Sequence, residues 1–413
     1  MLMRLSPTEQ VRPGSASLEG CPEAALSGTG SPAPCAEESV RTTGRQWRTL
    51  ADASHPSTLP PILPFSVEEA VAGPDALYAS MLKCRRGVGW KHSTQIYCLH
   101  ALRNVIDLSD AIRGGSYKEG TPKVVHITYP KKREAMSIPF RDRTFQRSLN
   151  DVVLYPGMVR SFIHANFACQ KGKGTDAARE YWRNALHRAY LKYGTDRFWV
   201  VCGDFKGYYD NMRHDVTNAL FASRLDPWSG SWTARTLDWQ YKGDKGYNPG
   251  SQMVQIAGIS YLDRFDHFMK ERLRLKMYIR YMDDFRAVCR TEEEGRAVLA
   301  AASEEAAKVG LTLHPAKSRM IKAADGALFL GFIYRVAPSG RVLMLRDPKR
   351  VKEARRKYRR LARKIRRGET AADRMDASYQ GVRECMTKGT NLRLVRRMDR
   401  FMDSLKGEME NGR

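Results

Sequence analysis

The chain has 413 residues, 42% of them hydrophobic, which is enough for one large core or for a core with a satellite domain. Its 70 Lys and Arg residues against 45 Asp and Glu residues give a formal charge of +25, as expected of a protein that lies along a phosphate backbone. No apolar run reaches the ~20 residues of a membrane-spanning helix, so a membrane partner is not expected.

The eight cysteines are spread along the chain without a CxxC pair, which disfavours a zinc site and a disulfide scaffold. The first residues, MLMRLSPTEQVRPG, lack the apolar segment of a signal peptide. We therefore expect the protein to work in the reducing cytoplasm.

The first part of the chain differs in composition from the rest. Residues 1–64 contain nine of the 19 prolines, with many Ser, Gly and Ala and little periodicity, which predicts a disordered leader. Ordered structure is expected from residue 65, where Ser66 can cap a helix. Residues 93–113 have helical periodicity, with apolar positions at Ile96, Leu99, Leu102, Ile106 and Ile112. A strand is expected at 124–130 and a helix at 140–159.

The middle of the chain alternates helical and strand-like patterns. A helix at 176–194 leads into a short buried strand that ends on Asp204. An amphipathic helix is expected at 256–273. The stretch KMYIRYMDDFRAVCR, residues 276–290, reads as a hairpin whose turn carries two adjacent aspartates. A further helix is expected at 292–310.

Toward the end, the chain becomes strongly basic. A second strand pair, at 327–336 and 341–346, precedes the stretch 346–367, which has 13 Lys and Arg and two acidic residues. Apolar residues recur there at helical spacing, which favours a docked helix with a cationic outer face over a solvated surface or a disordered tail. The excess of positive charge in this stretch indicates a phosphate-bearing partner. Residues 378–398 read as a helix, a turn and another helix.

The paired carboxylates of Asp283 and Asp284 are the candidate catalytic residues of the chain. Adjacent carboxylates repel each other, although a solvated hairpin turn would tolerate them. With Asp204 at the end of a second strand, the three could form the oxygen-rich clamp that two divalent ions about 4 Å apart require. In such a site one ion lowers the pKa of an attacking 3′-hydroxyl, and both stabilise charge on the transferred phosphate.

Over roughly residues 85–400 the chain resembles the reverse transcriptases. YMDD at 281–284 is similar to their catalytic hairpin, and DFKGYYDNMRHD at 204–215 to their first catalytic motif. The resemblance implies that Asp204, Asp283 and Asp284 are catalytic and hold metal. It also implies a metal contact from the backbone carbonyl of Phe205.

The same resemblance assigns nucleotide contacts. Tyr209 falls on the aromatic position that blocks a ribose 2′-hydroxyl and so favours deoxynucleotides. Asp210 is an alternative ligand or the cap of the following helix. KGYNPGSQMVQIAGISYLDRFDHF at 245–268 resembles the loop and helix that contact template and nucleotide, where Gly250 lets the backbone approach closely. Gln255 stands where many relatives have Pro.

The segment at 129–149 resembles the fingers of prokaryotic members, which makes Lys132 and Arg133 triphosphate contacts. Arg141, Asp142 and Arg143 could do the same or form a structural ion pair. ACQKGKGTDAA at 168–178 either contacts the template backbone or serves packing.

Downstream motifs complete the resemblance. GLTLHPAKS at 310–318 makes Lys317 a candidate to protonate or balance the departing pyrophosphate, with a plain surface Lys as the alternative. FLGFIY at 329–334 resembles the hairpin that grips the primer, and the basic helix after it the thumb. The expected nucleic-acid contacts are Tyr281, Met282, Gly331, Arg355, Arg359 and Arg363.

The resemblance implies an α+β right-hand polymerase fold, with fingers and palm built from antiparallel sheet packed on helices and with a helical thumb. We expect the leader at 1–64, fingers with part of the palm at 65–195, palm with catalytic hairpin and primer grip at 196–335, and the thumb at 336–413.

The implied activity is synthesis of DNA on a dedicated template RNA, from deoxynucleoside triphosphates and a primer, with two Mg²⁺ ions and Mn²⁺ as a substitute. In the KGKGT stretch within 168–178, at Gln255 and over 378–398, the chain looks most similar to enzymes of diversity-generating retroelements. This resemblance implies error-prone copying and a small basic accessory protein. Antiviral defence enzymes and retron enzymes of bacteria are the competing subclasses. A non-catalytic RNA-binding scaffold with a polymerase fold is the alternative from another class.

Overall fold

The computed structural model describes residues 66–127, 133–248 and 250–410, with only the backbone of Arg133 and Glu410. The predicted leader at 1–64 lies outside these residues. The helices are α1 (Val67–Ala72), α2 (Pro74–Arg85), α3 (His92–Leu99), α4 (Ala101–Arg113), α5 (Phe140–Leu149), η1 (Asn150–Leu154), α6 (Tyr155–Val159), α7 (Thr175–Tyr193), α8 (Tyr208–Asn211), α9 (His214–Arg224), α10 (Pro227–Gln240), α11 (Gln252–Tyr261), α12 (Asp263–His267), η2 (Phe268–Arg272), α13 (Glu292–Ala307), α14 (Pro348–Arg366), α15 (Asp373–Thr387) and α16 (Leu392–Glu410). The strands are β1 (Lys123–Ile127), β2 (Arg133–Ser137), β3 (Trp199–Asp204), β4 (Tyr278–Tyr281), β5 (Asp284–Cys289), β6 (Arg319–Lys322), β7 (Ala327–Phe329), β8 (Phe332–Val336) and β9 (Val342–Arg346).

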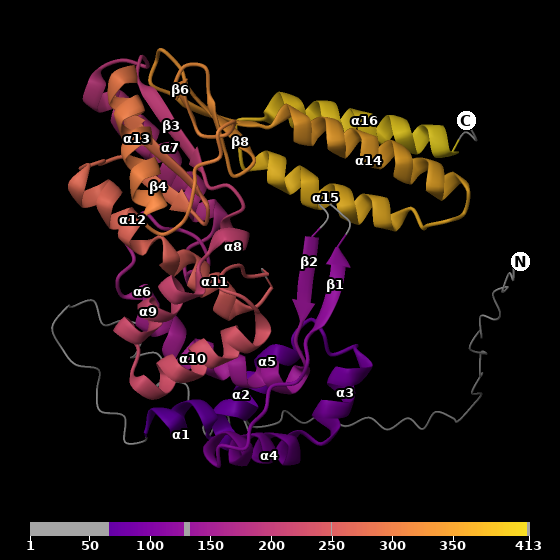
Figure 1. Ribbon diagram of the computed structural model, residues 1–413. Coiled ribbons are helices and arrows are strands. Elements are labelled where there is room, and N and C mark those ends of the chain that lie inside the picture. The colour runs from indigo at the N-terminus through magenta and orange to yellow at the C-terminus, as the bar shows by residue number, and fades with distance from the viewer. Residues whose placement is uncertain (1–65, 128–132, 249, 411–413) are drawn as a thin grey trace, which may run out of the picture. The chain divides into compact units, whose positions relative to one another are not determined.

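The described strands form three antiparallel sheets (Figure 1). The largest has the order β4-β5-β3-β6, so β3, the strand that ends on Asp204, lies between β5 and β6. β1 and β2 form a separate hairpin, and β7, β8 and β9 form a three-stranded sheet where the sequence predicted a strand pair. Sheets and helices together give the α+β class that the sequence predicted.

The central strand β3 is buried on both faces, as its continuous apolar run predicts. Val201 packs in the same core as α13, whereas Val200 and Cys202 pack with residues of α7. Successive side chains of a strand point to opposite faces. Helices on both faces therefore hold the strand rigidly and fix the position of Asp204 at its end.

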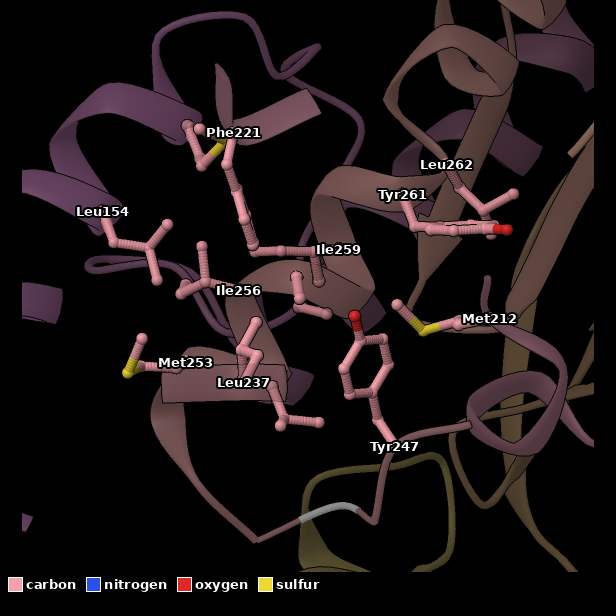
Figure 2. Close-up of a cluster of buried hydrophobic side chains, with 14 of the residues drawn as sticks. Leu154, Met212, Phe221, Leu237, Tyr247, Met253, Ile256, Ile259, Tyr261 and Leu262 are labelled. Carbon is pink, nitrogen blue, oxygen red and sulfur yellow. The ribbon is translucent and has the colours of Figure 1, made fainter. Parts of the chain in front are cut away.

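The helix predicted at 256–273 is interrupted, and only its first part, up to Tyr261, is buried almost all round. It begins earlier, at Gln252, and breaks at Leu262 into α11, α12 and η2. Ser251 caps α11 by accepting a hydrogen bond from the N–H of Val254. Figure 2 shows buried apolar side chains of α11 together with those that pack around it, and it labels Leu154, Met212, Phe221, Leu237, Tyr247, Met253, Ile256, Ile259, Tyr261 and Leu262.

The helix predicted at 93–113 is divided at His100 into α3 and α4. Because of this break, the apolar positions do not form one buried stripe. Ile112 is buried together with Val105 and Leu108. The remaining predicted positions are exposed, namely Ile96, Leu99, Leu102 and Ile106.

The C-terminal segment confirms the helical pattern of the basic stretch. Asp347 caps α14 by accepting a hydrogen bond from the N–H of Lys349. Tyr358 and Ala362 are buried against α15 and α16, which form the helix, turn and helix expected there. The cationic residues of α14 lie mostly on its exposed face. Among the described helices, none has the length and apolar character to cross a membrane.

Candidate active site

The three predicted carboxylates meet at one end of the central sheet. Asp204, the last residue of β3, pairs with Asp284, the first residue of β5, across the antiparallel ladder. Asp283 lies in the turn before β5, and its carbonyl accepts a hydrogen bond of 3.2 Å from the N–H of Phe205. Strand pairing therefore brings together residues that are about 80 positions apart in the chain.

The turn that carries the paired aspartates has a constrained backbone. Met282 adopts φ +57°, a left-handed conformation that is unfavourable for a residue with a side chain. Its carbonyl accepts a hydrogen bond of 2.7 Å from Nη1 of Arg280. An ionised donor gives a strong hydrogen bond, so Arg280 stabilises the strained turn directly.

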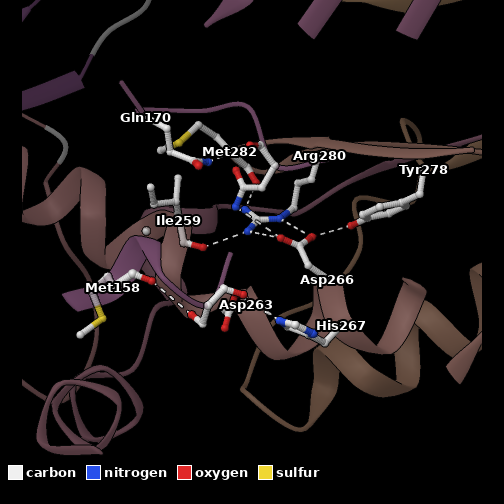
Figure 3. Close-up of polar contacts among 12 residues, drawn as sticks. Met158, Gln170, Ile259, Asp263, Asp266, His267, Tyr278, Arg280 and Met282 are labelled. Carbon is white, nitrogen blue, oxygen red and sulfur yellow. Dashed lines mark hydrogen bonds and ion pairs between the residues drawn. The ribbon is translucent and has the colours of Figure 1, made fainter. Parts of the chain in front are cut away.

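Arg280 belongs to a fully buried polar network behind the turn (Figure 3). Its Nε and Nη2 donate to the two carboxylate oxygens of Asp266, each over 2.7 Å, and Nη2 also donates to the carbonyl of Ile259 over 2.9 Å. The hydroxyl of Tyr278 donates to Asp266 over 2.7 Å. One side chain thus joins the turn to α11 and α12, and the surrounding charge raises the pKa of Arg280 despite its burial.

The electrostatics of the carboxylates favour a bound cation. Burial raises the pKa of Asp284 to about 6, and the charges of Asp204 and Asp283 add to the shift, whereas Arg286 opposes it. Burial and the charge of Asp204 also raise the pKa of Asp283. A nearby positive charge relieves this repulsion, because it favours the ionised form of each carboxylate.

Two cationic side chains already contact the carboxylates. Nζ of Lys317 donates to Oδ1 of Asp204 over 2.7 Å, and Arg286 forms an ion pair with Asp284. Within residues 66–127, 133–248 and 250–410, no three His, Cys, Asp or Glu side chains are placed to hold a metal ion. Carboxylate oxygens are nevertheless the ligands that Mg²⁺ prefers, and their mutual repulsion suits a divalent cation. Lys317 and Arg286 are the cationic side chains that contact the carboxylates here, and the two magnesium ions stay a prediction.

The predicted nucleotide contacts belong to different elements of the fold. Tyr209 lies in α8 and packs closely on Gly258 of α11, where a Cβ atom would lie 3.1 Å from the tyrosine hydroxyl. Gln255 is half-buried in α11. Gly250 lies just before that helix, and a Cβ atom there would lie 3.8 Å from the carbonyl of Met136.

The fingers segment is described only in part. Lys132 lies outside the described residues, and Arg133 begins β2. Asp142 is buried and accepts hydrogen bonds from the Tyr117 hydroxyl and from Nε of Arg141, which supports a structural ion pair rather than a triphosphate contact.

The structure also bears on two roles that the sequence left open, those of residues 168–178 and of Asp210. Lys173 donates to the carbonyls of His164 and Asn166, which supports packing at 168–178. Asp210 is exposed within α8, and the N-cap of α9 is Arg213, so the prediction that Asp210 caps this helix is wrong.

The predicted nucleic-acid contacts divide between the sheet and α14. Tyr281 ends β4 beside Met282, and Gly331 adopts φ +82° in the turn between β7 and β8. On α14, the guanidinium groups of Arg355 and Arg359 lie over the ring of Phe401 in α16, each at 5.4 Å. Arg363 is exposed. The structure therefore does not bring the three arginines of α14 to the carboxylates.

The sequence prediction missed Arg280 and Arg286, which contact Met282 and Asp284 in the hairpin at 276–290. Both lie within apolar strands, in IRY and DFRAVC, where a charged residue is uncommon. An arginine inside a buried strand next to candidate ligands is the signal that could have identified them.

A comparison with protein families agrees with this geometry. Residues 131–334 match the family model described as "Reverse transcriptase (RNA-dependent DNA polymerase)". This segment is a reverse-transcriptase domain. The match contains all three carboxylates and the turn at Gly331, and it confirms the right-hand polymerase fold expected from the resemblance. The prokaryotic origin and the retroelement subclass stay predictions.

Solved structures similar to the chain include telomerases. Apo telomerase from Candida tropicalis is 11% identical with a TM-score of 0.43, and the match covers 60% of this chain and 54% of that chain. Telomerase from Candida albicans, in complex with a TWJ fragment of telomeric RNA, is 11% identical with a TM-score of 0.42, covering 62% and 55%. The chain thus spans little more than half of those telomerases. No curated protein sequence matches it.

Proposed function

We propose that the protein is an RNA-directed DNA polymerase whose active site is formed by Asp204, Asp283 and Asp284. The observation that carries the proposal is the register of β3 and β5, which sets Asp204 opposite Asp284 and beside the turn of Asp283. The reverse-transcriptase domain at 131–334 supports the same reaction. Template RNA, a primer and deoxynucleoside triphosphates are the implied partners.

In the proposed site the three carboxylates and the carbonyl of Phe205 hold two Mg²⁺ ions, or Mn²⁺ in their place. When bound, the ions would lower the pKa of the attacking 3′-hydroxyl and stabilise the negative charge on the transferred phosphate. Lys317, already 2.7 Å from Asp204, has the position and charge to balance a departing pyrophosphate. Tyr209 blocks the ribose 2′-hydroxyl, with Gly250, Gln255, Lys132 and Arg133 as further nucleotide contacts.

We assign the polymerase subdomains as the sequence predicted. Residues 65–195 form the fingers with part of the palm, 196–335 the palm, and 336–413 the thumb. The exposed cationic face of α14 supports a thumb that follows the phosphate backbone without reading sequence.

Primer extension on an RNA template, with Mg²⁺, tests this function. Asp204→Asn and the double variant Asp283→Ala with Asp284→Ala are expected to lose extension and to keep RNA binding. Asp107→Asn is the matched control, because Asp107 is an exposed carboxylate of α4 that has no part in the proposed site. Extension by the Asp204→Asn variant at the wild-type rate would contradict the proposal. RNA binding without extension by the wild type would favour a non-catalytic scaffold.

For the biological role, we propose copying of a dedicated RNA in a diversity-generating retroelement, aided by a small basic accessory protein. The resemblance at 168–178, Gln255 and 378–398 supports this subclass. We place the reaction in the cytoplasm, where the described cysteine thiols would stay reduced. Sequencing the cDNA made from the cognate RNA tests the assignment. Errors concentrated at template adenines would support it, and errors spread evenly over the four bases would favour a defence or retron enzyme.

A further inference from the structure

Three arginines from three different elements converge on the turn between β7 and β8. This turn, residues 329–332, has two left-handed residues in succession, Leu330 with φ +46° and Gly331 with φ +82°. Two adjacent positive φ angles are typical of a tight hairpin turn, and they are unfavourable at Leu330 because it has a side chain. The turn therefore needs support from its surroundings.

Each arginine donates to a different carbonyl of this hairpin. Arg179 of α7 donates through Nη2 to the carbonyl of Leu330 over 2.9 Å. Arg346 of β9 donates through Nη1 to the carbonyl of Gly331 over 3.2 Å. Arg286 of β5 donates through Nη2 to the carbonyl of Leu328 over 2.6 Å.

The same guanidinium groups also lie over the aromatic rings on either side of the turn. Arg179 and Arg346 lie over Phe332 at 4.9 and 5.2 Å, and Arg286 lies over Phe329 at 5.2 Å. Cation–π contacts of this kind gain strength where water is excluded, and the side chains of Arg179 and Arg286 are only 14% and 9% exposed. The turn is therefore held by charge, by hydrogen bonds and by packing at once.

Arg286 differs from the other two because it also contacts the carboxylate pair. It forms an ion pair with Asp284 while its Nη2 reaches the carbonyl of Leu328. A guanidinium can do both, because its N–H groups form a rigid planar fork. The position of Asp284 and the position of the 329–332 turn are thus linked through one nearly buried side chain.

We propose that Arg286 is a positioning residue that couples Asp284 to the 329–332 turn, and that Arg179 and Arg346 hold the same turn from its other sides. The inference rests on the proposed polymerase function, in which this turn places the 3′ end of the primer. Through the coupling, the primer end and the catalytic carboxylates keep one fixed spacing.

The test compares Arg286→Met, Arg286→Lys and Arg179→Met with the wild type. Arg335→Met is the matched control, because Arg335 lies on β8 and donates to the carbonyl of Ala324, away from the turn. Two measurements are made on an RNA template with a DNA primer. The first is the single-turnover extension rate as a function of nucleotide concentration. The second is the fluorescence of a 2-aminopurine at the primer 3′ end without nucleotide, which reports how that end is seated. Thermal melting checks that each variant is folded.

Loss of a hydrogen bond from an ionised donor is expected to lower the saturated extension rate roughly tenfold to hundredfold in the two Met variants. Their apparent nucleotide affinity should stay close to that of the wild type, and their 2-aminopurine signal should change. Arg286→Lys keeps a cation beside Asp284 but lacks the planar fork, so it should share the change in fluorescence. Arg335→Met should match the wild type.

When Arg286→Met and Arg179→Met are combined, the loss of extension rate should be smaller than the product of the two single losses, because both variants act on one turn. Full recovery by Arg286→Lys would overturn the inference, since Arg286 would then only neutralise Asp284. Unchanged fluorescence in folded Arg179→Met would also overturn it. A wild type that extends no primer would instead refute the proposed function, and the fluorescence comparison would still decide whether the arginines seat the primer end.

Discussion

Replacing Arg280 with Met tests how the turn at Met282 is stabilised. Arg280 and Asp266 are both fully buried, and the pair is joined by two hydrogen bonds of 2.7 Å. Removing one partner of such a pair leaves an uncompensated buried charge, which typically costs about 3–5 kcal/mol. Since a typical domain is stable by about 5–15 kcal/mol, the Arg280→Met variant should unfold at a clearly lower urea concentration.

The double variant separates charge from packing. When Asp266→Leu is added to Arg280→Met, no buried charge is left unpaired, so about half of the lost stability or more should return. Arg103→Met is the control for a surface pair, because Arg103 and Asp107 are exposed, and it should have no measurable effect. A double variant as unstable as the sum of its single variants would refute the reasoning.

The same variants separate stability from activity. The hydrogen bond from Arg280 to the carbonyl of Met282 is lost in the double variant as well as in the single one. We therefore expect primer extension to stay impaired at a temperature where the double variant is folded. Recovery of both stability and extension would show that the left-handed conformation of Met282 needs no support from Arg280.

Three further predictions concern other parts of the chain. Tyr209→Ala should increase incorporation of ribonucleotides relative to deoxynucleotides, measured as the ratio of kcat/KM, and an unchanged ratio would contradict the role of the side chain. Gly389→Ala should lower the melting temperature, because a Cβ there would collide with the carbonyl of Met344, whereas Gly381→Ala in the open middle of α15 should be neutral or stabilising by up to about 1 kcal/mol. Burial alone would raise the pKa of Asp151, but hydrogen bonds from Lys83 and Arg147 lower it below the model-peptide value. Its contribution to stability should therefore be full above the unfolded-state pKa and be lost as the pH falls through the folded-state pKa. Urea unfolding should show Asp151→Asn less stable than the wild type at pH 7, with the gap closing in acid.

Local patterns in the sequence were sufficient to predict many elements. Ser66 is a cap as expected, and the strand that ends on Asp204 is buried on both faces. Caps and periodicity depend on residues within a few positions of one another, so they can be predicted without knowledge of the fold. The pattern at 93–113 did not reveal the break at His100 or the exposure of four of its apolar residues. Which apolar residues are covered depends on the neighbouring elements, and these cannot be read from a local pattern.

The sequence by itself determined the identity and order of the motifs, including the three aspartates and the basic final helices, because these are written in residue types and short spacings. Only the tertiary structure decided what surrounds them. Arg280 reaches Asp266, 14 residues away, and Arg286 reaches the carbonyl of Leu328, 42 residues away, through strand pairing and packing. Such contacts depend on the register of β3, β4 and β5, which brings distant residues to one end of the sheet and is set by the whole core rather than by any local pattern.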